Sequence, residues 1–223
     1  MNGLVANIFK LILAVAVVFS LGRANAAVLE IEPVAQQTPE WCFAASSAMI
    51  LQYLGYPNLN IAGDYQCGVV GAQGGYCAGN CAACLQSGGT MQRIALIVRS
   101  YATAAYQLTG YQNPTVNLRE FGILQPAQII DQIDRDGPIL AGISPTSVPY
   151  PPGTGFSQHA VVIVGYEGDA SNFYVILNDP YPYLPDADPY VATGNAKLQP
   201  GQYRVPFGAF VGIFHYGDSL TFR

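Results

Sequence analysis

Residues 36–47 read Gln-Gln-Thr-Pro-Glu-Trp-Cys-Phe-Ala-Ala-Ser-Ser, so that polar, turn-forming residues run into a Trp-Cys pair and then into small helix formers. An apolar run follows to Leu54, and Gly55 suits the position just after a helix end. The pattern predicts a loop that becomes a helix at Cys42. A thiol in the first turn of a helix faces backbone N–H groups without intrahelical partners, which favours the reactive thiolate. We therefore hypothesise that Cys42 is a catalytic nucleophile; the competing interpretation is an inert cysteine in a core helix.

The other four cysteines are close together in the sequence, at Cys67, Cys77, Cys81 and Cys84. In an exported chain such a cluster predicts two disulfides, with three possible pairings. A zinc site made of all four is the alternative, but the spacing contains no second Cys-x-x-Cys pair. The disulfide interpretation leaves Cys42 as the odd, unpaired thiol, which agrees with the hypothesis drawn from its local sequence.

The first 26 residues have the pattern of a secretory signal peptide. An apolar run at 11–21 follows a lysine, and Ala24-Asn25-Ala26 matches a small-x-small cleavage site. An uncleaved membrane anchor is the alternative, but the run is shorter than the ~20 residues needed to span a bilayer. We expect a signal peptide at 1–26 and a single domain at 27–223 with a disulfide-rich insertion around 58–89. The expected location is secreted or periplasmic.

Composition narrows the possible partners. Hydrophobic residues make up 51% of the chain and charged residues 10%, which indicates a well-buried globule and argues against a disordered chain. Removing residues 1–26 takes away two basic residues and no acidic one, which leaves seven basic against 14 acidic residues. An acidic chain without a basic cluster is a poor partner for nucleic acid or for an anionic membrane surface, so we expect neither. The expected oligomeric state is a monomer.

No pattern in the sequence indicates a cofactor or a metal ion. Asp186 and Asp188 could suggest a calcium loop, but an Asp-x-Asp pair among prolines is usually a solvated turn. We therefore expect no cofactor and no metal.

Hydrophobic periodicity predicts helices in the first part of the chain and strands in the second. The predicted helices are at 42–54, 90–105 and 125–135, and the predicted strands are at 138–144, 159–166 and 173–177, with possible edge strands at 202–205 and 212–222. A turn signal at 167–169 would join two of these strands into a hairpin. The segments at 110–122, 145–157 and 181–194 are predicted to be irregular. Helices before strands indicate an α+β fold.

The predicted hairpin brings together the partners that a cysteine nucleophile needs. A thiolate needs an imidazole beside it, and that imidazole needs a third group to hold its orientation. His159 begins the first strand of the hairpin, and Asn178 and Asp179 end the second. Either of these residues could therefore reach the ring of His159 from the side opposite Cys42. His215, the only other histidine, is interpreted as structural.

These motifs resemble those of the papain-like cysteine proteases. In that family a glutamine before the nucleophile helps to form the oxyanion hole, and a Cys-Trp-Ala-like stretch opens the central helix. A His-Ala/Val strand ending in Gly-Tyr carries the base, and an Asn or Asp after the next strand orients it. This chain offers, in the same order, Gln36 or Gln37, Trp41 to Ser46, His159 to Tyr166, and Asn178 or Asp179.

The match departs from plant-type papain at two places. The Cys-Gly-Ser/Ala-Cys-Trp/Tyr signature is absent, and Asn178-Asp179-Pro180-Tyr181 replaces the usual Asn-Ser-Trp. An Asp-Pro end resembles the bacterial papain-like groups with a Cys/His/Asp triad, which favours Asp179 over Asn178. The spacing of six residues before Cys42 favours Gln36 over Gln37.

The resemblance implies a papain-like fold, with a central N-terminal helix that carries the nucleophile and packs on an antiparallel β-sheet or half-barrel. It implies a secreted cysteine peptidase that acts on a peptide or protein through a thioester at Cys42. Cys42, His159 and Asp179 would be catalytic, and the Cys42 backbone and Gln36 would form the oxyanion hole. The alternatives are an exported, inactive papain-like binding protein, or an amidase or transpeptidase on the same scaffold. A disulfide-rich structural or adhesive protein fits the composition but does not explain the order of the motifs.

Overall fold

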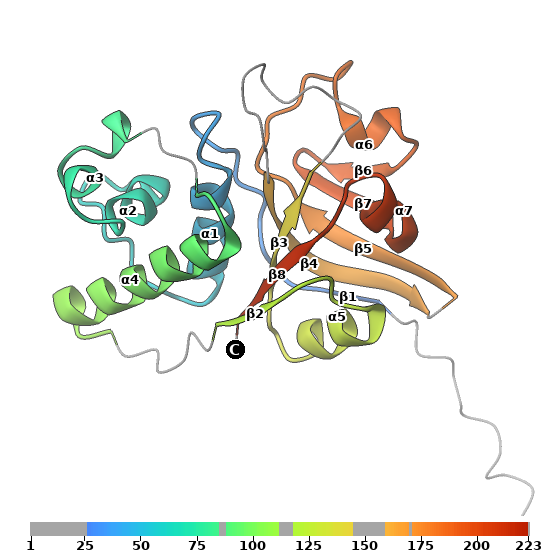
Figure 1. Ribbon diagram of the computed structural model, residues 1–223, viewed down its shortest axis with the longest axis horizontal. Helices are drawn as coiled ribbons and strands as arrows, with labels where there is room; N and C mark the ends of the chain where they lie inside the picture. Colours follow the sequence, from blue (N-terminus) through green and yellow to red (C-terminus); the bar gives the residue numbers. More distant parts are fainter. Residues whose placement is uncertain (1–25, 85–87, 112–117, 145–158, 170, 223) are drawn as a thin grey trace, which may run out of the picture.

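The computed structural model describes residues 26–84, 88–111, 118–144, 159–169 and 171–222. The predicted signal peptide, apart from Ala26, and the predicted loop at 145–157 lie outside these residues. Figure 1 shows two parts side by side, one made of the helices α1 to α4 and the other of a sheet with α5, α6 and α7 around it. The α+β prediction, with helices and strands segregated, is confirmed.

The helices include all three that the sequence predicts. In chain order they are α1 (Cys42–Tyr53), α2 (Tyr65–Gly71), α3 (Tyr76–Gly79), the 3-10 helix η1 (Cys81–Ala83), α4 (Met91–Thr109), α5 (Pro126–Ile133), α6 (Pro189–Ala192) and α7 (Phe207–Gly212). Local signals set the ends of the long ones. The Thr90 hydroxyl accepts a hydrogen bond from the Arg93 N–H at the start of α4, and Gly110 ends that helix in the left-handed conformation. Helix α1 begins at Cys42, as predicted.

The strands form one antiparallel sheet in the order β2-β8-β3-β4-β5-β7-β6, with β1 paired to β4. Their bounds are β1 (Ala26–Val28), β2 (Arg119–Phe121), β3 (Ile139–Ile143), β4 (His159–Asp169), β5 (Asn172–Asn178), β6 (Ala196–Gln199), β7 (Gln202–Pro206) and β8 (Asp218–Thr221). Strands β4 and β5 are the predicted hairpin, and Val162 lies opposite Asn178 in their register.

The segments at 202–205 and 212–222 do contain strands, as predicted, but their predicted position at the edges of the sheet is wrong. Strand β7 lies between β5 and β6, and β8 lies between β2 and β3. The true edges, β2 and β6, are short and carry little apolar periodicity, and β6 is exposed along its whole length. Residues 207–212 form α7, and the second predicted strand is limited to Asp218–Thr221. The irregular segments predicted at 110–122 and 181–194 likewise contain β2 and α6.

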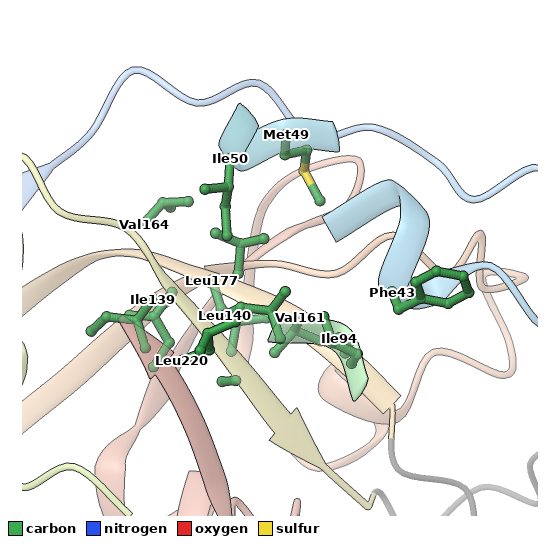
Figure 2. Packing of buried hydrophobic residues seen from close by; sticks show 14 of the residues in the cluster. Phe43, Met49, Ile50, Ile94, Ile139, Leu140, Val161, Val164, Leu177 and Leu220 are labelled. Carbon is green, nitrogen blue, oxygen red and sulfur yellow. The ribbon is translucent and has the colours of Figure 1, made fainter. Parts of the chain in front are cut away.

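Helix α1 is buried against the sheet. Its residues from Phe43 to Leu51 are all buried, as expected for a helix that is apolar around most of its circumference. Figure 2 shows Ile50 pointing from α1 toward the sheet, near Leu177 and Val161. Burying each such side chain contributes about 1.5–3 kcal/mol, so α1 is held firmly on β4. The expected central helix on an antiparallel sheet is confirmed.

The insertion between α1 and α4 contains α2, α3 and η1. Its cysteines pair as Cys67–Cys81 and Cys77–Cys84, which selects one of the three possible pairings and excludes the zinc interpretation. Among the described residues, Cys42 is the free cysteine. No helix within the described residue ranges is long and apolar enough to cross a membrane.

Candidate active site

Cys42 is the first residue of α1, at the end of the loop that begins at Gln36. Its side chain is partly exposed, in contrast to the buried residues that follow it in the helix. The N-cap residue is Trp41, whose side chain makes no capping hydrogen bond to the helix. The N-cap side chain therefore does not occupy the N–H groups of the first turn. These groups form the positive end of the helix dipole, which lies at the thiol.

His159 and Asp179 are in contact inside the protein. The Nε2 of His159 lies 2.6 Å from the Oδ1 of Asp179, and both side chains are fully buried. A carboxylate can only accept a hydrogen bond, so Nε2 carries the proton and donates it. His159 begins β4 and Asp179 follows the last residue of β5, and the register of the hairpin brings these two positions together.

The surroundings of His159 favour its protonated form. Burial by itself lowers the pKa of the imidazole, but the charge of Asp179 and its hydrogen bond act in the opposite direction. The side chain of Cys42, and the charge of its thiolate, add to this effect. Together they raise the pKa of His159 from 6.5 to about 10. The ring thus interacts with Cys42 as well as with Asp179, and these three residues form one contiguous group.

Asn178 does not join this group. Its side chain is completely buried, where Nδ2 donates to the Ile31 carbonyl at 2.7 Å and Oδ1 accepts from Gln202 at 2.9 Å. Its neighbour Asp179 points to His159. Asn178 therefore ties the N-terminal segment to the sheet, whereas Asp179 has the geometry of an orienting group.

The two adjacent glutamines also differ. Gln36 is buried, and its Nε2 donates to the carbonyls of Thr38 and Pro39 at 2.9 and 3.0 Å. Gln37 is exposed. Gln36 is thus the glutamine that lies inside the loop leading to Cys42, and in this structure its amide nitrogen holds that loop in shape.

The disulfide-stapled insertion braces the same loop from the other side. Gln66 of α2 is buried; its Nε2 donates to the Ala35 carbonyl at 2.8 Å, and its Oε1 accepts from the Gln37 N–H at 3.2 Å. The indole of Trp41 donates to the Cys84 carbonyl at 3.0 Å. These roles could not be predicted from the sequence, because each bond joins a side chain to the backbone of a residue 29 to 43 positions away.

Asp179 also receives hydrogen bonds from its own loop. Its Oδ2 accepts from the hydroxyls of Tyr190 at 2.8 Å and Tyr183 at 3.3 Å, and its Oδ1 accepts from the Tyr181 N–H at 2.8 Å. The segment at 181–194 was predicted to be a plain loop. Asp188-Pro189 has the pattern of a helix start, an N-cap followed by proline, and this signal could have revealed α6.

Asp188 itself differs from the expectation of a solvated turn. It is buried, it caps α6, and its Oδ2 lies 3.0 Å from Lys197 Nζ and 2.9 Å from the Tyr203 hydroxyl.

Over the described ranges, no group of three or more His, Cys, Asp or Glu residues has an arrangement that could hold a metal ion. His215 is exposed, in a left-handed conformation with φ 48°.

Comparison with known proteins gives one family match. The model of the "Peptidase_C39 like family" matches residues 28–197. A search of curated proteins found no match. Among solved structures, a digestive procathepsin L2 proteinase from the larval midgut of Tenebrio molitor is 16% identical, with 85% of this chain and 64% of that chain covered and a TM-score of 0.48. For procathepsin L 3 of the same tissue the values are 13%, 87%, 69% and 0.43. The chain therefore spans less than two thirds of the length of the first of these.

Proposed function

Because the chain belongs to the Peptidase_C39-like family, within the papain-like cysteine protease superfamily, we propose that it is a secreted cysteine peptidase. It would hydrolyse peptide bonds through a thioester at Cys42. The observation that carries the proposal is the buried hydrogen bond of 2.6 Å between His159 and Asp179, on a ring whose pKa is also raised by Cys42. A free thiol, a buried imidazole and a carboxylate in that order are the parts of a cysteine nucleophile with its base and orienting group.

The reaction follows from these positions. The Cys42 thiolate attacks the carbonyl carbon of the scissile amide and forms a tetrahedral oxyanion. The His159 imidazolium then gives its proton to the leaving amine as the C–N bond breaks, which leaves a thioester. The neutral imidazole takes a proton from water, and the resulting hydroxide attacks the thioester; the C–S bond breaks, the carboxylic acid leaves, and the Cys42 thiolate and the His159 imidazolium are regenerated. Asp179 keeps the proton on Nε2 throughout.

Two donors are available for the oxyanion. The backbone N–H of Cys42 belongs to the first turn of α1, and Gln36 lies in the loop immediately before it. Because the Gln36 amide nitrogen donates to the carbonyls of Thr38 and Pro39, it would serve the oxyanion once one of these bonds opens. Binding of substrate would therefore rearrange this loop.

Export is the second part of the proposal. The two disulfides of the insertion support an oxidising compartment, as does the signal-like sequence at 1–26. The substrate would be a peptide or a protein, and a monomer would suffice because Cys42, His159 and Asp179 all come from one chain.

A peptide library tests the activity. We expect wild-type protein to generate new peptide termini, detected by mass spectrometry, and Cys42→Ala to generate none. Cys42→Ser is the matched control, because it keeps the size of the side chain but has a far weaker nucleophile. Cleavage by Cys42→Ala at the wild-type rate would refute the assignment of the nucleophile. A protein that cleaves nothing, and whose Cys42 reacts only sluggishly with iodoacetamide, would be a binding protein instead. New peptide bonds in the presence of added amines would indicate transpeptidation.

A further inference from the structure

Asp179 is held by more than its partner in the proposed triad. Four donors surround its carboxylate: His159 Nε2 and the Tyr181 N–H at Oδ1, and the hydroxyls of Tyr190 and Tyr183 at Oδ2. Of the two hydroxyls, that of Tyr190 is closer, at 2.8 Å against 3.3 Å. A buried carboxylate with donors on both oxygens has a fixed orientation and a stabilised negative charge.

The position of Tyr190 is itself tightly determined. Its ring is fully buried and stacks between Tyr203 and Phe214, with ring centroids 4.1 and 4.5 Å away and interplanar angles of 19° and 14°. Two stacked neighbours leave the ring no room to tilt, so the hydroxyl is aimed at Asp179.

The backbone of Tyr190 is anchored as well. Asp188 accepts from the Tyr190 N–H at 3.1 Å and caps the helix that carries it. Asp188 is in turn held by Lys197 and by the Tyr203 hydroxyl. Tyr190 is therefore part of a rigid support, which extends from the surface lysine to the carboxylate beside His159.

We propose that Tyr190 is a positioning residue that orients Asp179 and reduces the stabilisation that Asp179 gives to the charged imidazolium of His159. The inference rests on the proposed function, in which His159 must give up a proton in each cycle. A hydroxyl that donates to Oδ2 draws negative charge away from the imidazolium at Oδ1. Without that hydroxyl, the carboxylate would keep the imidazolium protonated to higher pH, and the proton would be harder to transfer to a leaving amine.

The titratable groups around this pair are few among the described residues. Cys42, Asp179 and the ring of Tyr181, whose centroid lies 6.3 Å from that of the imidazole, face His159, whereas Tyr183 and Tyr190 face Asp179. Tyr203 is close enough to feel the charges of both Asp188 and Asp179, which together with burial raise its pKa. Tyr203 stacks on Tyr190, but its hydroxyl donates a hydrogen bond to Asp188.

This arrangement supplies a matched pair of variants. Tyr190→Phe removes the hydroxyl on Asp179 and keeps the stack, whereas Tyr203→Phe removes an equally buried hydroxyl that does not touch Asp179. Both are made in a Cys42→Ala background, so that the thiol does not titrate. The readout is the NMR titration of the histidine rings, in which the exposed His215 is the internal reference.

We expect Tyr190→Phe to raise the titration midpoint of His159 by about half to one pH unit, and Tyr203→Phe to leave it close to that of the parent. Tyr183→Phe should give a smaller shift in the same direction, and it provides a second test if Tyr190→Phe does not fold. With Cys42 restored, kcat should fall in Tyr190→Phe with little change in KM. An unchanged midpoint in Tyr190→Phe, or an equal shift in Tyr203→Phe, would overturn the inference. The titration needs no substrate, so a protein without peptidase activity would refute the proposed function and leave this inference testable.

Discussion

Replacing Asp179 with asparagine removes the carboxylate charge from His159 while keeping a side chain of the same size. The asparagine oxygen can still accept a hydrogen bond from Nε2, so the orientation of the imidazole ring can be retained. What changes is the pKa of the imidazole. Burial, the largest influence on the imidazole, lowers its pKa and is no longer opposed by the charge of Asp179.

The size of the effect follows from the pKa of His159. In the wild-type protein it is about 10, so at pH 7.5 the ring is almost fully protonated. Without the charge we expect a value at or below 6.5, so that at most about a tenth of the rings carry the second proton at pH 7.5. The imidazolium that stabilises the Cys42 thiolate is then lost in about nine molecules out of ten. The reaction of Cys42 with iodoacetamide at pH 7.5 should fall about tenfold or more.

The same shift predicts a pH dependence of stability. A folded-state pKa above the unfolded value of 6.5 contributes stability that is fully present below pH 6.5 and is lost as the pH rises through about 10. Because one pKa unit corresponds to about 1.36 kcal/mol, the contribution is on the order of a few kcal/mol. Asp179→Asn lacks it, so the difference in the free energy of unfolding between wild type and variant should shrink between pH 6.5 and 10. Urea titrations at several pH values measure this difference.

Asn178→Ala is the matched control one residue away. It removes the bonds to Ile31 and Gln202 and should cost about 2–4 kcal/mol of stability, while the alkylation rate of Cys42 in the folded protein stays near that of wild type. The reasoning fails if Asp179→Asn alkylates at the wild-type rate, or if Asn178→Ala slows alkylation as much as Asp179→Asn does.

Three further predictions concern the supports of the site. Gln66→Met keeps the side-chain volume but leaves the Ala35 carbonyl and the Gln37 N–H unpaired, so the free energy of unfolding should fall by about 2–4 kcal/mol and kcat should fall with it. An unchanged midpoint of urea unfolding would show that Gln66 does not stabilise the loop before Cys42. Reduction of the two disulfides, which close loops with separations of 14 and 7 residues, should lower the free energy of unfolding by about 4–6 kcal/mol, measured with and without a phosphine reductant; equal midpoints would argue against this estimate. Ser46→Ala removes a hydrogen bond of 2.9 Å from α1 to the Ala160 carbonyl and should cost about 1–3 kcal/mol in thermal or urea unfolding, whereas no loss would mean that water replaces the hydroxyl.

The long elements of the fold could be predicted from sequence because local signals agree with the packing. Helix α4 has its N-cap at Thr90 and its stop at Gly110, and β4 is a continuous β-branched run. The short elements could not. Strand β8 has only four residues, and its central place comes from β2 and β3 on either side, which no local pattern records.

The candidate site was predictable for a similar reason. A hairpin places the start of one strand beside the end of the next, so recognising β4 and β5 was enough to place His159 near either Asn178 or Asp179, and the structure shows that it is Asp179. The supports of the site were not predictable, because Tyr190 and Gln66 act through the identity of distant partners. A tyrosine-rich segment shows where hydroxyls are available but not which carboxylate they meet.

The position of β8 inside the sheet, between β2 and β3, has a consequence for biosynthesis. Helix α1 and the insertion leave the ribosome early, but β3 lacks one of its two neighbours until residues 218–221 have been synthesised. The paired residues of β3 and β8 are about 80 positions apart, and closing a loop of that length is slow compared with forming a helix. Strand β4, which carries His159, is hydrogen-bonded to β3 on one side and to β5 on the other, so the completion of β3 affects one of its two long neighbours. A nascent chain therefore contains Cys42 and the insertion long before the sheet that positions His159 and Asp179 is complete.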